Sequence, residues 1–176
     1  MKSLTDHLCQ YAAYHRDRRN IATHFVGIPM IVLAVVVLLA RPSLDLAGWP
    51  VSAATVAALA ATLYYLRLDL RLGAVMGALL LGCLWLAQAT AALSTSAWAA
   101  VGLGLFVVGW IIQFVGHIFE GRKPAFVDDI TGLIIGPLFV VTEVGFLLGL
   151  RPELQAQVEQ RAGPTRSGPA APAQAR

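Results

Sequence analysis

The strongest constraint on the fold of this chain is a series of apolar stretches, each of bilayer-spanning length. A transmembrane helix needs about 20 mainly apolar residues, within a range of about 17 to 25. Charged residues make up only 13% of the chain, against roughly a quarter in soluble domains. The sequence therefore predicts an all-α, polytopic transmembrane helical bundle with four to five membrane segments, at Ile21–Ala40, Trp49–Leu66, Gly73–Leu93, Trp98–Phe119 and Ile130–Leu150.

The last of these stretches differs from the others because its apolar pattern is interrupted. Gly136 and Pro137 lie inside it, and Glu143 adds a carboxylate. Non-helical backbone is tolerated at membrane depth only where it is buried in protein or lines a cavity. We therefore expect this stretch to be either a kinked span or a re-entrant hairpin, with Glu143 serving either the fold or a nearby site.

Pairs of glycines four residues apart recur in the apolar stretches. In lipid such pairs let helix backbones approach closely. A chain rich in Gly and Ala also produces such pairs by chance, so both interpretations stay open for Gly73 and Gly77, Gly132 and Gly136, and Gly145 and Gly149.

The composition changes after Leu150. Arg151–Arg161 is polar and is expected to form a short helix, whereas Ala162–Arg176 is mainly Pro, Ala, Gly and Ser and is expected to be disordered. We predict a membrane-embedded helical domain over residues 1–152 and a polar, largely disordered tail over residues 153–176.

Lysines and arginines gather in alternate connections between the apolar stretches. They are frequent in the N-terminal segment and after the second and fourth stretches, and sparse after the first and third. Because cytoplasmic loops carry the excess of Lys and Arg, this alternation predicts a cytoplasmic N-terminus. The basic residues form no face on a soluble element, so membrane lipids are expected partners and nucleic acid is not. A homo-oligomer is left open.

The chain contains four histidines, at His7, His15, His24 and His117. His15 and His24 stand at the start of the first apolar stretch, and His117 lies near the end of the fourth. Four crossings separate them, and an even number of crossings returns a chain to the face from which it started. We therefore expect these histidines at one membrane face, whatever the path of the fifth stretch.

Polar residues on the fourth stretch share the helix face of His117. Gln113, His117 and Glu120 stand at i, i+4 and i+7 and line one face of a helix. Ionisable side chains at the membrane edge are costly and usually functional. The alternative is that such residues only extend their polar ends to the interface.

The spacing of His15 and His24 constrains the local backbone if both bind one ion. On a continuous helix, residues nine apart are about half a turn out of phase and about 13 Å from each other. A shared metal site therefore requires a helix break, which we expect around Arg16–Asn20. Asn20 and His24 then fall on the same face of the following helix.

Histidines accompanied by a carboxylate, with few sulfur ligands nearby, suit an iron(II) or zinc site. We expect this metal site at the cytoplasmic face of the membrane domain of residues 1–152. Four histidines are too few for the histidine boxes of di-iron desaturases and hydroxylases. A bis-histidine haem needs two facing ligands, and only His24 and His117 approach that arrangement. A haem- or metal-binding membrane protein and a non-enzymatic membrane scaffold stay open as alternatives to an enzyme.

Three sequence motifs resemble those of one membrane protein family, the Mpo-type 2-hydroxy fatty acid dioxygenases. The motifs are YxxYHxxxxNxxxHxxGxP at Tyr11–Pro29, QFVGHxFExRxPA at Gln113–Ala125 and GPxFVVxE at Gly136–Glu143. The resemblance covers about residues 8–152, and the second and third apolar stretches match only in hydrophobic character.

The resemblance implies an oxidoreductase that shortens 2-hydroxy fatty acids by one carbon, in fatty acid α-oxidation, with Fe(II) and dioxygen. It implies the endoplasmic reticulum as the location in a eukaryote, and the inner membrane is expected in a bacterium.

The resemblance also assigns roles to individual residues. The family's metal-binding histidines fall on His15, His24 and His117. Glu120 falls on its glutamate, which either completes the ligand set or orients a histidine. Asn20 and Gln113 are then expected to hydrogen-bond ligands or substrate. The substrate carboxylate is expected to be held by a basic residue among Arg19, Arg122 and Lys123.

Overall fold

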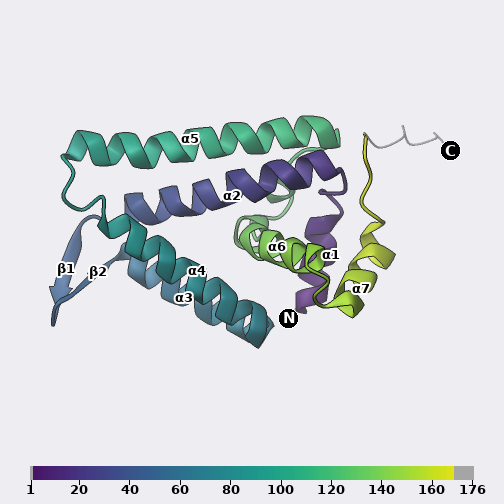
Figure 1. Cartoon of the computed structure of the whole chain (residues 1–176), viewed down its shortest axis with the longest axis horizontal. Helices are drawn as coiled ribbons and strands as arrows, with labels where there is room; N and C mark the ends of the chain where they lie inside the picture. The colour runs from purple at the N-terminus through teal and green to yellow at the C-terminus, as the bar shows by residue number, and fades with distance from the viewer. Residues whose placement is uncertain (1, 169–176) are drawn as a thin grey trace. The chain divides into compact units, whose positions relative to one another are not determined.

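The computed structural model describes residues 2–168 and is built almost entirely of α-helices (Figure 1). Within that range the chain forms seven α-helices, the short 3-10 helix η1 (Ala125–Val127) and one two-stranded hairpin. The predicted all-α class is therefore confirmed. The α-helices are α1 (Leu4–Ala12), α2 (Arg18–Leu39), α3 (Ala53–Leu68), α4 (Leu70–Gln88), α5 (Thr95–Glu120), α6 (Gly132–Leu147) and α7 (Pro152–Ala162).

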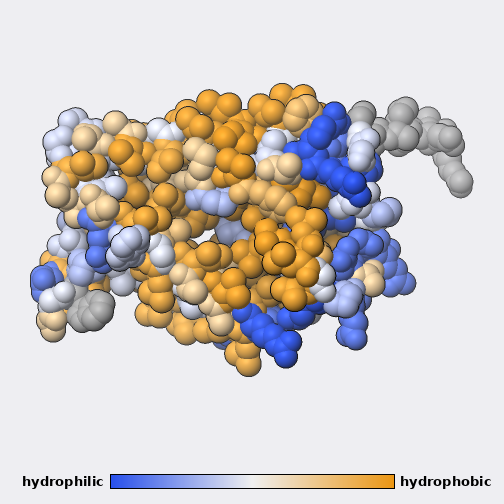
Figure 2. Space-filling model, in the orientation of Figure 1, coloured by the Kyte–Doolittle hydropathy of each residue, from blue (hydrophilic) through white to orange (hydrophobic). Residues whose placement is uncertain are grey.

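Three helices in the described residues, α2, α4 and α5, are long and apolar enough to cross a bilayer. α6 and α7 pass as a fourth candidate, bent by 117° at the break between them. α3 is also apolar but has only 16 residues. The face drawn in Figure 2 is mostly hydrophobic over the long helices. The chain is therefore an integral membrane protein whose last segment is bent, as the sequence predicts. The interruption was expected at Gly136 and Pro137, but α6 continues through both residues, and the bend lies between Leu147 and Pro152.

The chain divides into two units, which are residues 1–26 with 111–176 and residues 27–110. α2 and α5 contribute residues to both units. In the unit of residues 27–110, α3 and α4 pack closely and are joined by Asp69. The Asp69 carboxylate caps α4 by accepting hydrogen bonds of 3.0 Å from the amides of Arg71 and Leu72.

The glycine pair in α4 mediates the packing of α3 against α4. A Cβ atom added at Gly73 would lie 2.5 Å from a backbone nitrogen of α3, and one at Gly77 would lie 2.9 Å from the Thr62 methyl carbon. At Gly145 and Gly149 an added Cβ would meet nothing within 4 Å. The close-packing interpretation therefore holds for the first pair, and the last pair makes no such contact.

The chain before α3 differs from the prediction. A helix was expected from Trp49, but β2 (Trp49–Ser52) pairs antiparallel with β1 (Ser43–Leu46). Ala47 and Gly48 close the hairpin with positive φ angles of 54° and 84°. Apolar composition alone does not separate a short strand from a helix, so the predicted span began four residues before the observed helix.

The third apolar stretch also ends earlier than predicted, because α4 stops at Gln88 instead of continuing to Leu93. The Arg41 guanidinium provides the reason. It donates hydrogen bonds to backbone carbonyls just beyond the helix, at Thr90, Ala91 and Leu93. A cation at a helix C-terminus satisfies carbonyls that have no partner within the helix.

In the other unit, α1 packs against α6 and α7. α1 begins with a capping box in which the side chains of Ser3 and Asp6 each accept a hydrogen bond from the other's backbone amide. α7 buries Leu154 and Val158. An ion pair of 2.9 Å joins Arg161 on α7 to Asp6 on α1.

The polar segment after Leu150 forms the short helix that the sequence predicts, which is α7. Residues 163–168 follow it outside any helix, and Arg166 makes a parallel bridge to Asp17. Disorder was expected from Ala162 onward, but Ala162 ends α7, and Gly163, Arg166 and Gly168 make hydrogen bonds within the described chain. The remaining residues of the predicted tail, 169–176, lie outside the described range.

Candidate metal centre

Three histidines form a buried cluster within the unit of residues 1–26 and 111–176. One ring nitrogen from each of His15, His24 and His117 lies within 4.8 Å of the other two. The ring centroids are 4.5, 5.0 and 5.1 Å apart, and the ring planes meet at 71°, 69° and 80°. The predicted meeting of these histidines is therefore confirmed.

Three different elements deliver the histidines. His24 lies in the second turn of α2, His117 in the last turn of α5, and His15 in the loop of residues 13–17 between α1 and α2. The predicted helix break between His15 and His24 is therefore present. It begins three residues before the expected stretch, Arg16–Asn20, and ends where α2 begins at Arg18.

Backbone carbonyls orient two of the three rings. His15 Nδ1 is 2.7 Å from the Tyr11 carbonyl oxygen, and His24 Nδ1 is 2.8 Å from that of Asn20. Because a carbonyl oxygen only accepts, both Nδ1 atoms carry the hydrogen, and each Nε2 keeps its lone pair. The Tyr11 ring also stacks on His15, with centroids 4.2 Å apart and planes 5° apart.

The cluster fits a metal ion. His15 Nε2 and His117 Nδ1 are buried without a hydrogen-bond partner among the described residues, and a buried polar atom left without a partner is rare in native proteins. Burial, followed by the neighbouring His24 ring, lowers the pKa of His15 well below its usual range, so this ring is neutral near pH 7. A neutral imidazole is the form that binds metal ions.

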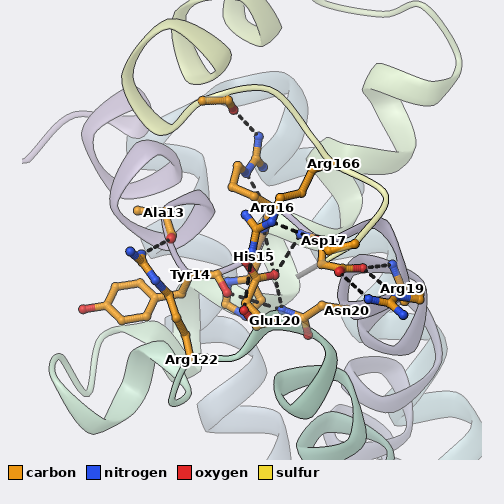
Figure 3. Close-up of polar contacts among 12 residues, drawn as sticks. Ala13, Tyr14, His15, Arg16, Asp17, Arg19, Asn20, Glu120, Arg122 and Arg166 are labelled. Carbon is orange, nitrogen blue, oxygen red and sulfur yellow. Dashed lines mark hydrogen bonds and ion pairs between the residues drawn. The ribbon is translucent and has the colours of Figure 1, made fainter. Parts of the chain in front are cut away.

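Glu120 lies beside the cluster and holds the loop that carries His15 (Figure 3). Its Oε2 accepts hydrogen bonds from the backbone amides of Arg16 at 3.0 Å and Asp17 at 2.8 Å, and from Asn20 Nδ2 at 3.0 Å. Its Oε1 accepts one from Arg166 Nη2 at 2.6 Å. Both carboxylate oxygens therefore have protein partners, and Glu120 is not among the residues whose atoms converge with the histidines.

Gln113 lies one turn before His117 on α5. Its side chain is buried, and neither its amide oxygen nor its amide nitrogen has a hydrogen-bond partner among the described residues. An amide offers two donors and an acceptor, so Gln113 could bind a polar ligand next to His117.

The three basic residues predicted to hold a carboxylate each have a partner in the protein. Arg19 pairs with Asp17 at 2.9 Å, Arg122 Nη1 donates to the Ala13 carbonyl at 2.8 Å, and Lys123 pairs with Asp128 at 2.6 Å. Because Arg19, Arg122 and Lys123 bind three different groups of the protein, they do not form one shared anion site in this structure.

Sequence reasoning missed the roles of two arginines. Arg16 is one of the basic residues of the N-terminal segment that were counted for orientation, but it is buried and pairs with Glu143 at 3.2 Å. Its position next to His15 in the first motif was the available signal. Arg166, which pairs with Glu120, stands in a Gly- and Pro-rich segment that carries no such signal.

Comparison with known proteins identifies the family. Residues 1–148 match the family described as Mpo1-like, 2-hydroxy-palmitic acid dioxygenase. The chain belongs to the Mpo1-like family. It is 34% identical over 151 residues to the 2-hydroxy-palmitic acid dioxygenase MPO1 of Saccharomyces cerevisiae, which covers 85% of this chain and 83% of the yeast protein. No solved structure matches the chain significantly.

The Mpo1-like match includes all three clustered histidines, together with Asn20, Gln113 and Glu120. The resemblance inferred from the sequence motifs is therefore confirmed at the level of the family. Arg166 lies 18 residues beyond the end of the match, at residue 148.

Proposed function

We propose that this protein is an Fe(II)-dependent dioxygenase that shortens 2-hydroxy fatty acids by one carbon. The observation that carries the proposal is the convergence of three buried imidazoles at one point in a member of the Mpo1-like family. The name of the yeast relative supports 2-hydroxypalmitate as a substrate. Iron is proposed instead of zinc because the reaction consumes dioxygen and zinc has no redox chemistry.

The proposed net reaction is balanced by dioxygen alone. The bond between C1 and C2 breaks, C1 leaves as carbon dioxide, and C2 becomes the carboxyl carbon of the shorter acid. C2 loses three electrons and C1 loses one, and one dioxygen molecule accepts all four. The products are the shortened acid, carbon dioxide and one water.

His15, His24 and His117 would hold the iron. When bound there, Fe(II) would supply the redox chemistry and a place where the hydroxyl and carboxylate of the substrate bind together. The Tyr11 and Asn20 carbonyls keep the first two rings in the orientation that points their lone pairs away from the backbone.

Neighbouring polar residues take supporting roles in this proposal. Glu120 and Asn20 hold the loop of residues 13–17, so that His15 stays in the cluster. The buried and unpartnered amide of Gln113 binds a polar group of the substrate. Arg19, Arg122 and Lys123 stay candidates for the substrate carboxylate, and each would have to exchange its present partner to bind it.

A cavity of about 450 Å³ beside α2 could accommodate the acyl chain of the substrate. Its size falls within the ~300–1,000 Å³ of typical ligand pockets. Its apolar lining comes from α2, α6 and α7 and includes Ile21, Phe25 and Phe146. The other half of the lining is charged or polar: Arg16, Arg18, Glu143, Gln155, Glu159 and Thr165. We propose that the acyl chain occupies this cavity. The membrane domain stays proposed as residues 1–152, and α7 and Thr165 add part of the cavity wall.

The site is proposed to face the cytoplasm, where an amphiphile can present its headgroup while its chain stays apolar. The alternation of basic loops supports this orientation. The close histidine cluster also favours a single ion over haem, since rings with centroids about 5 Å apart leave no slot for a flat macrocycle. In a purely structural scaffold, buried ring nitrogens should have hydrogen-bond partners, whereas His15 Nε2 and His117 Nδ1 have none among the described residues.

The full chain, purified in detergent and loaded anaerobically with Fe(II), should convert 2-hydroxypalmitate to pentadecanoic acid when oxygen is admitted. Palmitate is the matched control and should give no product, because it lacks the 2-hydroxyl group. Mass spectrometry of the fatty acids measures both. An iron-loaded protein that converts no 2-hydroxy acid of any chain length would contradict the proposed activity.

A further inference from the structure

The segment after α7 returns to the loop that carries His15. We call residues 163–168 the C-terminal strap. The Arg166 amide donates to the Arg16 carbonyl at 2.8 Å, and the Arg18 amide donates to the Arg166 carbonyl at 2.9 Å. Arg16 Nη1 also donates to the Gly163 carbonyl at 3.0 Å. The strap is therefore hydrogen-bonded at Gly163 and at Arg166 to the chain around His15.

The side chain of Arg166 reaches past the loop to Glu120 (Figure 3). Its Nη2 atom lies 2.6 Å from Glu120 Oε1, and the Glu120 side chain is 1% exposed. A buried carboxylate is costly unless it is paired. The three donors to Oε2 are uncharged amides, so Arg166 supplies the positive charge in direct contact with Glu120.

The other charged groups near Glu120 already have partners. Arg16 pairs with Glu143, and Arg19 pairs with Asp17. Among the described contacts, neither of these arginines reaches the Glu120 carboxylate. Loss of Arg166 would therefore leave the carboxylate buried without a cation.

Glu120 in turn holds the backbone that follows His15. Its Oε2 binds the amides of Arg16 and Asp17, the two residues directly after that histidine. We propose that Arg166 is a positioning residue of the metal centre, and that the C-terminal strap holds His15 in the cluster through Glu120. This inference rests on the proposed metal centre and adds to it a part of the chain that the family match does not include.

The test is a titration of Co(II) into the detergent-purified full chain, followed by its visible absorption spectrum. Loss of a group that orients a metal ligand typically costs about 10- to 100-fold in metal affinity, and we expect a loss of that order for Arg166→Ala. The Co(II) spectrum should change as well, because His15 is no longer fixed. Arg166→Lys keeps the charge and should give an affinity between those of wild type and the alanine variant.

Arg161→Ala is the matched control. Arg161 also lies near the C-terminus and pairs with a carboxylate, Asp6, but that pair is exposed and does not contact the loop. This variant should bind Co(II) with the wild-type affinity and spectrum. Equal losses for Arg161→Ala and Arg166→Ala would indicate a general effect of charge and would overturn the inference.

A double variant tests whether Arg166 acts through Glu120. In a Glu120→Gln background, adding Arg166→Ala should change the Co(II) affinity by no more than about twofold, because the effects of coupled residues are not additive. A full further loss would overturn the inference, as would wild-type binding by Arg166→Ala alone, and either result leaves the proposed function intact. A wild-type chain that binds no Co(II) would remove the metal centre itself.

Discussion

Replacing His117 with alanine should abolish iron binding and product formation together. His117 is the only ligand that α5 contributes to the three-histidine cluster. Loss of a ligand should lower the affinity by more than the roughly 10- to 100-fold expected for loss of a group that only orients one. Elemental analysis of iron per chain after anaerobic loading, with the 2-hydroxypalmitate assay on the same sample, measures both effects.

His7→Ala is the control for this experiment. His7 lies on α1 and is not among the three clustered histidines. The variant should keep the iron content and turnover of the wild type. A His117→Ala protein that still binds one iron per chain would show that the cluster is not the iron site.

Replacing Gly116 with alanine should destroy the site without touching a ligand. A Cβ added there would lie 2.1 Å from Thr23 Oγ1 and 2.5 Å from Asn20 Oδ1, both on α2. α2 and α5 would have to separate where they carry His24 and His117. Overpacking of this kind typically costs about 1–3 kcal/mol of stability, and we expect iron binding to be lost as well.

Gly104→Ala is the matched control because it makes the same change in the same helix. An added Cβ at Gly104 meets nothing within 4 Å, and alanine is favoured over glycine in a helix by up to about 1 kcal/mol. This variant should keep its iron and unfold at the same denaturant concentration or slightly higher. Gly116→Ala with unchanged iron content and stability would contradict the proposed role of close helix packing.

The membrane fold could be predicted because long apolar helices leave a strong signal. α2, α4 and α5 all fall on stretches chosen by length and hydropathy alone. The hairpin at β1 and β2 could not be predicted in this way, since its strands of four residues are too short to show a period. The end of α4 depends on Arg41, a contact between residues about 50 positions apart.

The histidine cluster could be predicted chiefly because the resemblance to the Mpo-type family assigns all three histidines to one metal site. Parity over four predicted crossings agreed with this assignment, although α3, one of the four, is shorter than the candidate spans. If His15 and His24 share one ion, helical phase then requires a break between them. The break lies at residues 13–17, partly before the expected stretch. Glu120, a residue about 100 positions away in the sequence, accepts hydrogen bonds there from the backbone amides of Arg16 and Asp17. Such a partner is visible only once the chain has folded.

Other features of the site left weak signals or none. Gly102, Gly109 and Gly116 stand seven residues apart on α5, and an added Cβ at each would lie within 3 Å of a side chain on α2. That spacing marks a close-packed helix face and was a readable signal. Arg166 has no motif around it, and its role follows only from the path of the strap.

The most direct test of the account is X-ray absorption at the iron edge of the Fe(II)-loaded full chain. Imidazole rings give a characteristic outer-shell scattering pattern, so the number of histidine ligands can be counted. The account predicts one iron per chain with three imidazole ligands, and two in His15→Ala. Iron bound without imidazole scattering, or with the same number of imidazoles in both proteins, would contradict it.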